Sequence, residues 1–324
     1  MRKLGYLARA LSLLTLTILA GSIAMAQNNT TWVAQDGDDA SVNCSFTAPC
    51  RTFAVAVSKT ANQGQLITKT AGNFGPVTIT QSITINGLGA TTGIQVPNNA
   101  NAITISTSVI GDVVHLSGLN LNGSHQGGTP SAQFIGIVFN GIGALVIENT
   151  NIENFSNGGI NFAPAAGGGE LYVRDSTITN NEFFGIQAAS NTSGNAFVSI
   201  DTTRLTNNGR YATGTALQLG SRTLGAIRDS VVSGSGGGGI SAQPAVGTSV
   251  FNVESTLVHN NGSGVVAGFS AGTASIRISN TTIVDNTGAG FTYTGGSSIV
   301  SLGSNKVSGN GAGNGPPTSY VPQQ

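Results

Sequence analysis

Charged residues are scarce in this chain, and their scarcity excludes several classes of partner. Asp, Glu, Lys and Arg make up 8% of the 324 residues, and 13 basic residues balance 13 acidic ones. Three of the basic residues, Arg2, Lys3 and Arg9, precede an apolar run near the N-terminus. The remainder holds 10 basic against 13 acidic residues, a net charge of −3. Nucleic acids and anionic membranes are bound through basic patches, so neither is expected as a partner.

Cysteine, histidine and tryptophan are also rare. The two cysteines, Cys44 and Cys50, lack further ligands at metal-site spacing, and the three histidines are scattered, so we expect no metal site. Trp32 is the single tryptophan, and aromatic residues make up 6% of the chain. This composition disfavours a conventional aromatic platform for sugars.

Long apolar runs are confined to the N-terminus. The run from Leu11 to Ala24 follows basic residues and ends in the small-x-small motif Ala24-Met25-Ala26. We therefore predict a signal peptide over residues 1–26, a secreted protein (periplasmic, extracellular or at the cell surface) and no membrane span after cleavage. A membrane anchor is the alternative, but a span needs about 20 apolar residues. Secretion favours a local disulfide between Cys44 and Cys50.

The chain is rich in a degenerate repeat. Each unit has two short alternating apolar runs before an Asn-rich corner and a third after it, which predicts three strands and no amphipathic helix. A β-branched or leucine residue recurs at steps of 24 to 27 residues, at Ile152, Ile178, Leu205, Val232, Leu257, Ile283 and Val307. The fold class predicted is all-β: a right-handed, single-stranded parallel β-helix of about nine coils with three short strands each.

This solenoid divides the rest of the chain into three parts. Residues 27–64 form an N-terminal cap, in which Thr52 to Lys59 is predicted as a short helix burying Phe53, Ala56 and Val57. Residues 65–310 form the β-helix, and residues 311–324 form a loose C-terminal tail. The first coil is expected to contain the strand-like runs Leu66-Ile67, Val77 to Ile79 and Ile83 to Ile85.

The cap also contains Asp36-Gly37-Asp38-Asp39, whose aspartate spacing resembles part of a calcium loop. The full loop needs a Glu eleven residues after the first Asp, where this sequence has Thr47. An ordinary solvated turn is therefore the preferred interpretation. No cofactor is expected, and calcium is kept as the alternative.

The same region carries a family resemblance. It is similar to the N-terminal module of secreted bacterial right-handed parallel β-helix proteins of the pectin-lyase-like superfamily, on the segments Thr47 to Lys59, Gly64 to Ile67, Gly72 to Gly75, Val77 to Ile79 and Ser82 to Gly87. The later Asn-Asn and Gly-Ile coils resemble the generic repeat of that family. The resemblance implies the fold and a capping helix, whereas activity depends on the site.

The resemblance implies that a member which cuts acidic polysaccharides would carry catalytic motifs, and this chain lacks them. The coils contain no Asn-Thr-Asp, no His-Gly and no Arg-x-Lys, the nearest remnant being Ile276-Arg277-Ile278. Lysine, a candidate base for a lyase, occurs near the coils only at Lys69 and Lys306. Neither the hydrolase nor the lyase pattern is present.

One set of carboxylates remains as a catalytic candidate. Asp175, Asp201, Asp229 and Glu254 lie 26, 28 and 25 residues apart, which predicts a row at one corner of four successive coils. Such a row could bind calcium or form an acid–base pair. The preferred interpretation is structural, with turn carboxylates accepting backbone N–H groups, because the row continues as the uncharged Asn280.

A second row is expected to be an asparagine ladder, in which side-chain amides hydrogen-bond between coils. It comprises Asn154, Asn180 or Asn181, Asn207 or Asn208, Asn260 or Asn261, Asn286 and Asn310.

Two functions follow from these patterns. The preferred one is a non-catalytic scaffold or binding protein associated with polysaccharide or a cell-surface glycan, because stacked coils make a long flat face. The alternative is a polysaccharide lyase or glycoside hydrolase that uses the carboxylate row. A glycan array combined with an assay of chain cleavage would separate the two.

Overall fold

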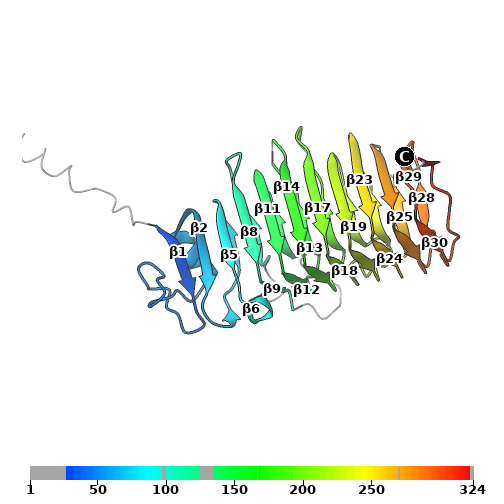
Figure 1. Cartoon of the computed structure of the whole chain (residues 1–324). Helices are drawn as coiled ribbons and strands as arrows, with labels where there is room; N and C mark the ends of the chain where they lie inside the picture. The colour runs from blue at the N-terminus through cyan, green and yellow to red at the C-terminus, as the bar shows by residue number, and fades with distance from the viewer. Residues whose placement is uncertain are drawn as a thin grey trace, which may run out of the picture.

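The fold is an elongated parallel β-solenoid with a cap at its N-terminal end (Figure 1). The computed structural model describes residues 27–96, 100–124, 134–165, 167–190, 192–268 and 271–321. The predicted signal peptide, residues 1–26, lies outside this range and stays a prediction. Within the described residues, no helix is long and apolar enough to cross a bilayer.

Three parallel sheets run along the solenoid, and each coil contributes a strand to each sheet in turn. Sheet A contains β1 (Asn28–Val33), β2 (Thr60–Thr68), β5 (Ile83–Asn86), β8 (Val113–Ser117), β11 (Gly143–Glu148), β14 (Gly169–Arg174), β17 (Ala196–Asp201), β20 (Thr223–Arg228), β23 (Thr248–Glu254), β26 (Thr273–Ser279), β29 (Ser298–Ser301) and β31 (Ser319–Tyr320). Sheet B contains β3 (Gly72–Asn73), β6 (Thr92–Gln95), β9 (Asn120–Asn122), β12 (Asn151–Glu153), β15 (Thr177–Thr179), β18 (Arg204–Thr206), β21 (Val231–Ser233), β24 (Leu257–His259), β27 (Thr282–Val284) and β30 (Lys306–Ser308). Sheet C contains β4 (Val77–Ile79), β7 (Ile103–Ile105), β10 (Ile135–Phe139), β13 (Gly158–Phe162), β16 (Phe184–Ala188), β19 (Thr215–Leu219), β22 (Gly238–Ala242), β25 (Ser263–Ala267) and β28 (Phe291–Tyr293). The described part of the shortest sheet, sheet C, has nine strands, close to the coil count that the repeat predicts.

The interior is a continuous stack of mainly aliphatic side chains, with several buried phenylalanines among them. Ile152, Ile178, Leu205 and Val232 are fully buried and pair in register across sheet B. The next member of this row is Val258 and not the predicted Leu257, because Val258 is the central residue of β24 and points inward. Side chains alternate between the two faces of a strand, so a difference of one residue moves a side chain from the core to the surface.

The N-terminal cap contains the predicted helix. Helix α2 (Phe53–Lys59) buries Phe53, Ala56 and Val57, as expected, and the Thr52 side chain accepts a hydrogen bond from the Val55 N–H at its N-terminus. A 3-10 turn, η1 (Gly89–Thr91), is the other helical element described. The Phe53 and Phe74 rings pack 5.2 Å apart, which fixes the helix on the first coil.

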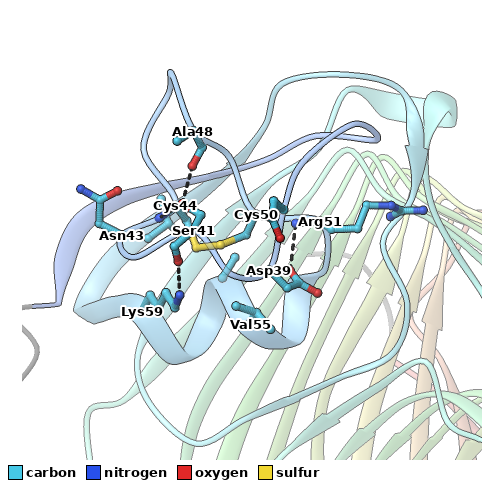
Figure 2. The surroundings of a disulfide bond; sticks show 12 residues. Asp39, Ser41, Asn43, Cys44, Ala48, Cys50, Arg51, Val55 and Lys59 are labelled. Carbon is cyan, nitrogen blue, oxygen red and sulfur yellow. Dashed lines mark hydrogen bonds between the residues drawn. A yellow bond between two sulfur atoms is a disulfide. The ribbon is translucent and has the colours of Figure 1, made fainter.

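A disulfide-bonded loop covers the free edge of sheet A (Figure 2). The predicted disulfide between Cys44 and Cys50 is confirmed. The Trp32 N–H donates to the Cys44 carbonyl, and the Cys50 N–H donates to the Trp32 carbonyl. The unpaired backbone of the edge strand β1 is therefore satisfied by this loop, which protects it from pairing with another chain.

Both ends of the solenoid extend further than the sequence suggests. Strand β1 pairs with β2, so sheet A begins within the predicted cap. The first coil consists of β2, β3 and β4, so its sheet B strand is Gly72–Asn73 and not the predicted run from Ile83 to Ile85. That run is part of β5, which begins the second coil. At the other end, Ser319–Tyr320 pairs with β29, so the predicted loose tail closes the sheet.

Candidate functional site

The outward face of sheet A carries the richest set of functional side chains that the structure describes. Along each strand, every second residue points to solvent, and parallel pairing aligns these residues into rows across successive coils. Two rows matter for chemistry. One lies at the C-terminal ends of the strands and is charged; the other lies in the middle of the strands and contains Tyr172.

The charged row alternates in sign. Glu148 pairs in register with Arg174, Arg174 with Asp201, Asp201 with Arg228, and Arg228 with Glu254. The Arg174 Nε lies 2.7 Å from Glu148 Oε1, and the Arg228 Nη2 lies 2.8 Å from Asp201 Oδ2. We call these five residues the charge ladder. Each carboxylate is next to an arginine on an adjacent strand, so the ladder is close to neutral overall.

This register corrects the predicted carboxylate row. Asp201 and Glu254 are the last residues of their strands and belong to the charge ladder. Asp175 and Asp229 lie one position further along, at left-handed corners with φ of 49° and 48°. The four carboxylates therefore do not form one row, because arginines occupy the strand ends before Asp175 and Asp229. At the corners, Asp is tolerated because its short polar side chain suits a left-handed backbone.

The N-terminal end of the ladder includes a histidine. His115 Nε2 lies 3.2 Å from Glu148 Oε2, on the side of Glu148 opposite to the arginine strand. Burial raises the pKa of Glu148, but hydrogen bonds and positive charge from Arg174 and His115 outweigh burial and hold the pKa below its usual value. Glu148 is therefore a stable anion and a poor general acid.

Two exposed aromatic side chains lie on the strands of the ladder, nearer to the strand starts. Tyr172 in β14 and Phe197 in β17 are 44% and 48% exposed, although both are large rings. The Tyr172 hydroxyl donates to Glu170 Oε2 at 2.7 Å, and this bond raises the pKa of the phenol. Phe197 also lines a groove of about 370 Å³ near the strand starts, together with the exposed Ile110 and Val113. The face thus offers apolar rings next to charged hydrogen-bonding groups.

Sequence reasoning missed this aromatic patch. In Gly169–Arg174 and Ala196–Asp201, apolar residues alternate between the two faces of the strand. Tyr172 and Phe197 directly precede the buried Val173 and Val198, so the sequence pattern alone could have predicted that both rings point to solvent. The low overall aromatic content concealed it, because composition does not report clustering.

The predicted asparagine ladder is present, and in each Asn-Asn pair the second residue is the one that joins it. Asn181 Nδ2 donates to Asn208 Oδ1, Asn261 Nδ2 to Asn286 Oδ1 and Asn286 Nδ2 to Asn310 Oδ1, at 2.8 to 3.1 Å. The first residues of the pairs, Asn180, Asn207 and Asn260, have left-handed φ of 54° to 57° and form exposed corners. Asn154, at the equivalent corner with φ of 61°, is half-buried and donates to Asn122 Oδ1 at 3.4 Å. Asn286 and Asn310 are buried members of the ladder, as predicted.

The predicted acidic turn of the cap has a structural role. Asp39 accepts hydrogen bonds from the Arg51 and Thr52 N–H groups and from the Thr52 hydroxyl, and Asp38 accepts one from the Ala40 N–H. Figure 2 shows Asp39 beside Arg51 in the disulfide loop. Within the described ranges, no three His, Cys, Asp or Glu residues come together as metal ligands.

Comparison with solved structures identifies similar folds. The chain is 15% identical to pectate lyase Pel9A, with a TM-score of 0.62 over 90% of this chain and 80% of that one. It is 11% identical to the GH136 lacto-N-biosidase from Eubacterium ramulus, with a TM-score of 0.55 over 91% of this chain and 67% of that one. It is 8% identical to XylC, solved with xylose, with a TM-score of 0.51 over 84% and 68%. At these identities the likeness concerns the fold alone.

Sequence comparison gives the family. No curated protein matches this sequence. The family model described as "Right handed beta helix region" matches residues 135–312, which is more than half of the chain and spans the coils that carry the charge ladder and the asparagine ladder. Together with the three parallel sheets, this match shows that the chain belongs to the right-handed β-helix family.

Proposed function

We propose that this protein is a secreted, non-catalytic β-helix that binds polysaccharide or a cell-surface glycan along the outward face of sheet A. The observation that carries the proposal is the pair of exposed rings, Tyr172 and Phe197, on adjacent strands that both also contribute a residue to the charge ladder. Sugar rings present apolar C–H faces and polar hydroxyl edges, so they match aromatic side chains bordered by hydrogen-bonding groups.

The shape of the face supports an extended ligand. Strands in sheet A repeat about every 4.8 Å, so a flat surface several coils long presents rings and polar groups along one direction. The side chains of Arg174 and Arg228 are about 60% exposed, and their guanidinium groups retain donors for a ligand. The named activities of the similar folds, a pectate lyase and a lacto-N-biosidase, add support for carbohydrate as the ligand class.

The electrostatics favour binding without cleavage. Hydrolysis of a glycosidic bond needs one protonated carboxyl group and one free carboxylate on the two sides of the bond. Here Asp201 and Glu254 are separated by the strand of Arg228, which pairs with Asp201. A lyase would need a base, but the raised pKa of Tyr172 keeps the phenol protonated.

A glycan array of the purified protein tests binding. We expect at least one polysaccharide to bind, and Tyr172→Ala and Phe197→Ala each to weaken that binding by about tenfold. Tyr320→Ala is the matched control, because Tyr320 is 72% exposed on the terminal strand β31, away from the charge ladder. Equal binding by all three variants would place the ligand elsewhere.

Release of reducing ends, or of unsaturated products, from whichever glycans bind tests the absence of catalysis. We expect none above background. Turnover that disappears in Asp201→Asn, with an unchanged circular dichroism spectrum, would replace the binding function with the hydrolase or lyase alternative.

A further inference from the structure

A second groove lies on the outward face of sheet C, on a different side of the solenoid from the charge ladder. It has a volume of about 510 Å³ and spans β19, β22 and β25. Its side-chain lining includes Thr213, Thr215, Ser241, Gln243, Ser263 and Val266. None of the described residues that line it is charged.

One position in the outward row along the groove, Gly238, has no side chain, and we call this position the notch. Gly238 in β22 pairs in register with Ser263 in β25. A Cβ atom on Gly238 would meet only side-chain carbons, at 3.3 to 3.7 Å, so backbone packing does not demand a glycine there. By contrast, a Cβ on Gly236 or Gly262 would collide with carbonyl oxygens of the neighbouring coil.

In an earlier coil, a large aromatic side chain covers the equivalent glycine. Gly158 in β13 pairs with Phe184 in β16, just as Gly238 pairs with Ser263. The Phe184 ring covers Gly158 and packs with Ile135 and Val138 in a small apolar cluster on sheet C. At the later notch the covering residue is Ser263, which is too small to fill the space.

Two hydroxyl groups at this groove lack hydrogen-bond partners. The side-chain oxygens of Thr215 and Ser241 are buried, with residues only 6% and 1% exposed, and neither has a partner among the residues that the structure describes. A buried hydroxyl without a partner destabilises a fold, and most are satisfied by protein or water. A hydroxyl can rotate to donate to or accept from a ligand seated in the groove.

We propose that this groove is a binding subsite for a short, uncharged oligosaccharide segment. The sugar hydroxyl groups would pair with Thr215, Ser241 and Gln243, and the C–H face of a sugar ring would rest against Val266. The absence of charge from the lining disfavours uronate sugars, and the volume lies within the range of about 300–1,000 Å³ for small-ligand sites. This subsite is independent of the proposed glycan face on sheet A, since the two share no residue.

Titration calorimetry with neutral tetrasaccharides (cello-, xylo-, manno- and galacto-series) tests the subsite, with tetragalacturonate as the charged comparison. We expect at least one neutral tetrasaccharide to bind at concentrations up to about 10 mM. Ser263→Phe, which copies the Phe184 arrangement, should abolish this binding, whereas Ser263→Ala should retain it. Tyr320→Ala, on the terminal strand β31, should leave it unchanged. Ser263→Phe should also leave unaltered any glycan binding that depends on Tyr172 and Phe197, so failure here is distinguishable from failure of the proposed function.

Removal of each hydroxyl should change the binding affinity and the melting temperature in opposite directions. Thr215→Val replaces the hydroxyl with a methyl group of similar size, and Ser241→Ala removes it, so each variant lacks one unpaired oxygen. We expect each to weaken binding by about five- to tenfold while the melting temperature stays equal or rises. A fall in melting temperature with binding retained would assign the hydroxyls a structural role. No binding by any neutral tetrasaccharide, or full binding by Ser263→Phe with an intact fold, would overturn the proposal.

Discussion

Arg228 in β20 lies 2.8 Å from Asp201 in β17, so an ion pair joins two successive coils on the outward face of sheet A. The arginine side chain is 59% exposed and the aspartate 28%. An exposed pair of this kind contributes little stability, but it keeps a guanidinium group beside the Asp201 carboxylate. The same alternation recurs at Glu148 and Arg174, so it is a property of the row and not of one pair.

The first prediction follows from that exposure. Asp201→Asn should cause a small loss of stability at about 0.01 M salt that disappears at about 1 M salt, because screening removes exposed pairwise attraction. Urea unfolding at the two salt concentrations measures the difference. A loss of equal size at both concentrations would indicate that Asp201 acts through a dry, structural contact instead.

A second prediction concerns the pH dependence at Glu148. Its pKa is lowered in the folded state, so its contribution to stability is present above the unfolded value of about 4.3 and is lost as pH falls through the folded value. Arg174→Gln removes one of the groups that lower the pKa of Glu148. The stability difference between this variant and the parent should therefore be present at neutral pH and shrink as the pH falls below about 4. Denaturant unfolding across that range checks the sign; a difference that grows in acid would contradict it.

The asparagine ladder gives a third prediction. Asn208 is fully buried, donates to the Ile178 carbonyl at 2.7 Å and accepts from the Asn181 side chain at 2.9 Å. Asn208→Leu leaves these partners unsatisfied and should cost about 3 kcal/mol of unfolding free energy. Asn207→Gly is the neighbouring control, because Asn207 has a left-handed φ of 54° that glycine adopts readily, so its cost should be below about 0.5 kcal/mol. Equal costs would mean that the ladder does not run through Asn208.

The disulfide loop provides the fourth prediction. Cys44→Ser with Cys50→Ser opens a loop of six-residue separation and should cost about 2 kcal/mol. The loop covers β1, so backbone amides such as those of Trp32 and Ala34 should exchange faster, while the coils from β14 onward keep their protection. Trp32 is the single tryptophan and packs on Phe46 at 5.0 Å, so its fluorescence reports the same opening. Uniform acceleration of exchange along the whole chain would show that the cap and the coils unfold as one unit.

Local patterns in the sequence were sufficient for much of this fold. The step of 24 to 27 residues between apolar positions determines a parallel solenoid, because each coil leaves an apolar inward face that only a similar neighbour can cover. The short helix with Phe53, Ala56 and Val57 on its buried face and the Cys44–Cys50 disulfide also follow from neighbouring residues. These features depend on spacing within one coil or one loop, which the chain displays directly.

Only the tertiary structure decided the exact rows. Asp175 and Asp201 are 26 residues apart in sequence, but the register pairs Arg174 with Asp201, so a row of acids becomes an alternation of acids and arginines. The same one-residue offset selects Asn208 over Asn207 for the ladder and Val258 over Leu257 for the core. Coil lengths vary by a few residues, and a strand reverses the direction of its side chains at every residue, so spacing alone cannot determine which side chains meet. The notch at Gly238 depends likewise on Ser263 from the next coil, and only the register of the folded sheet brings the two together.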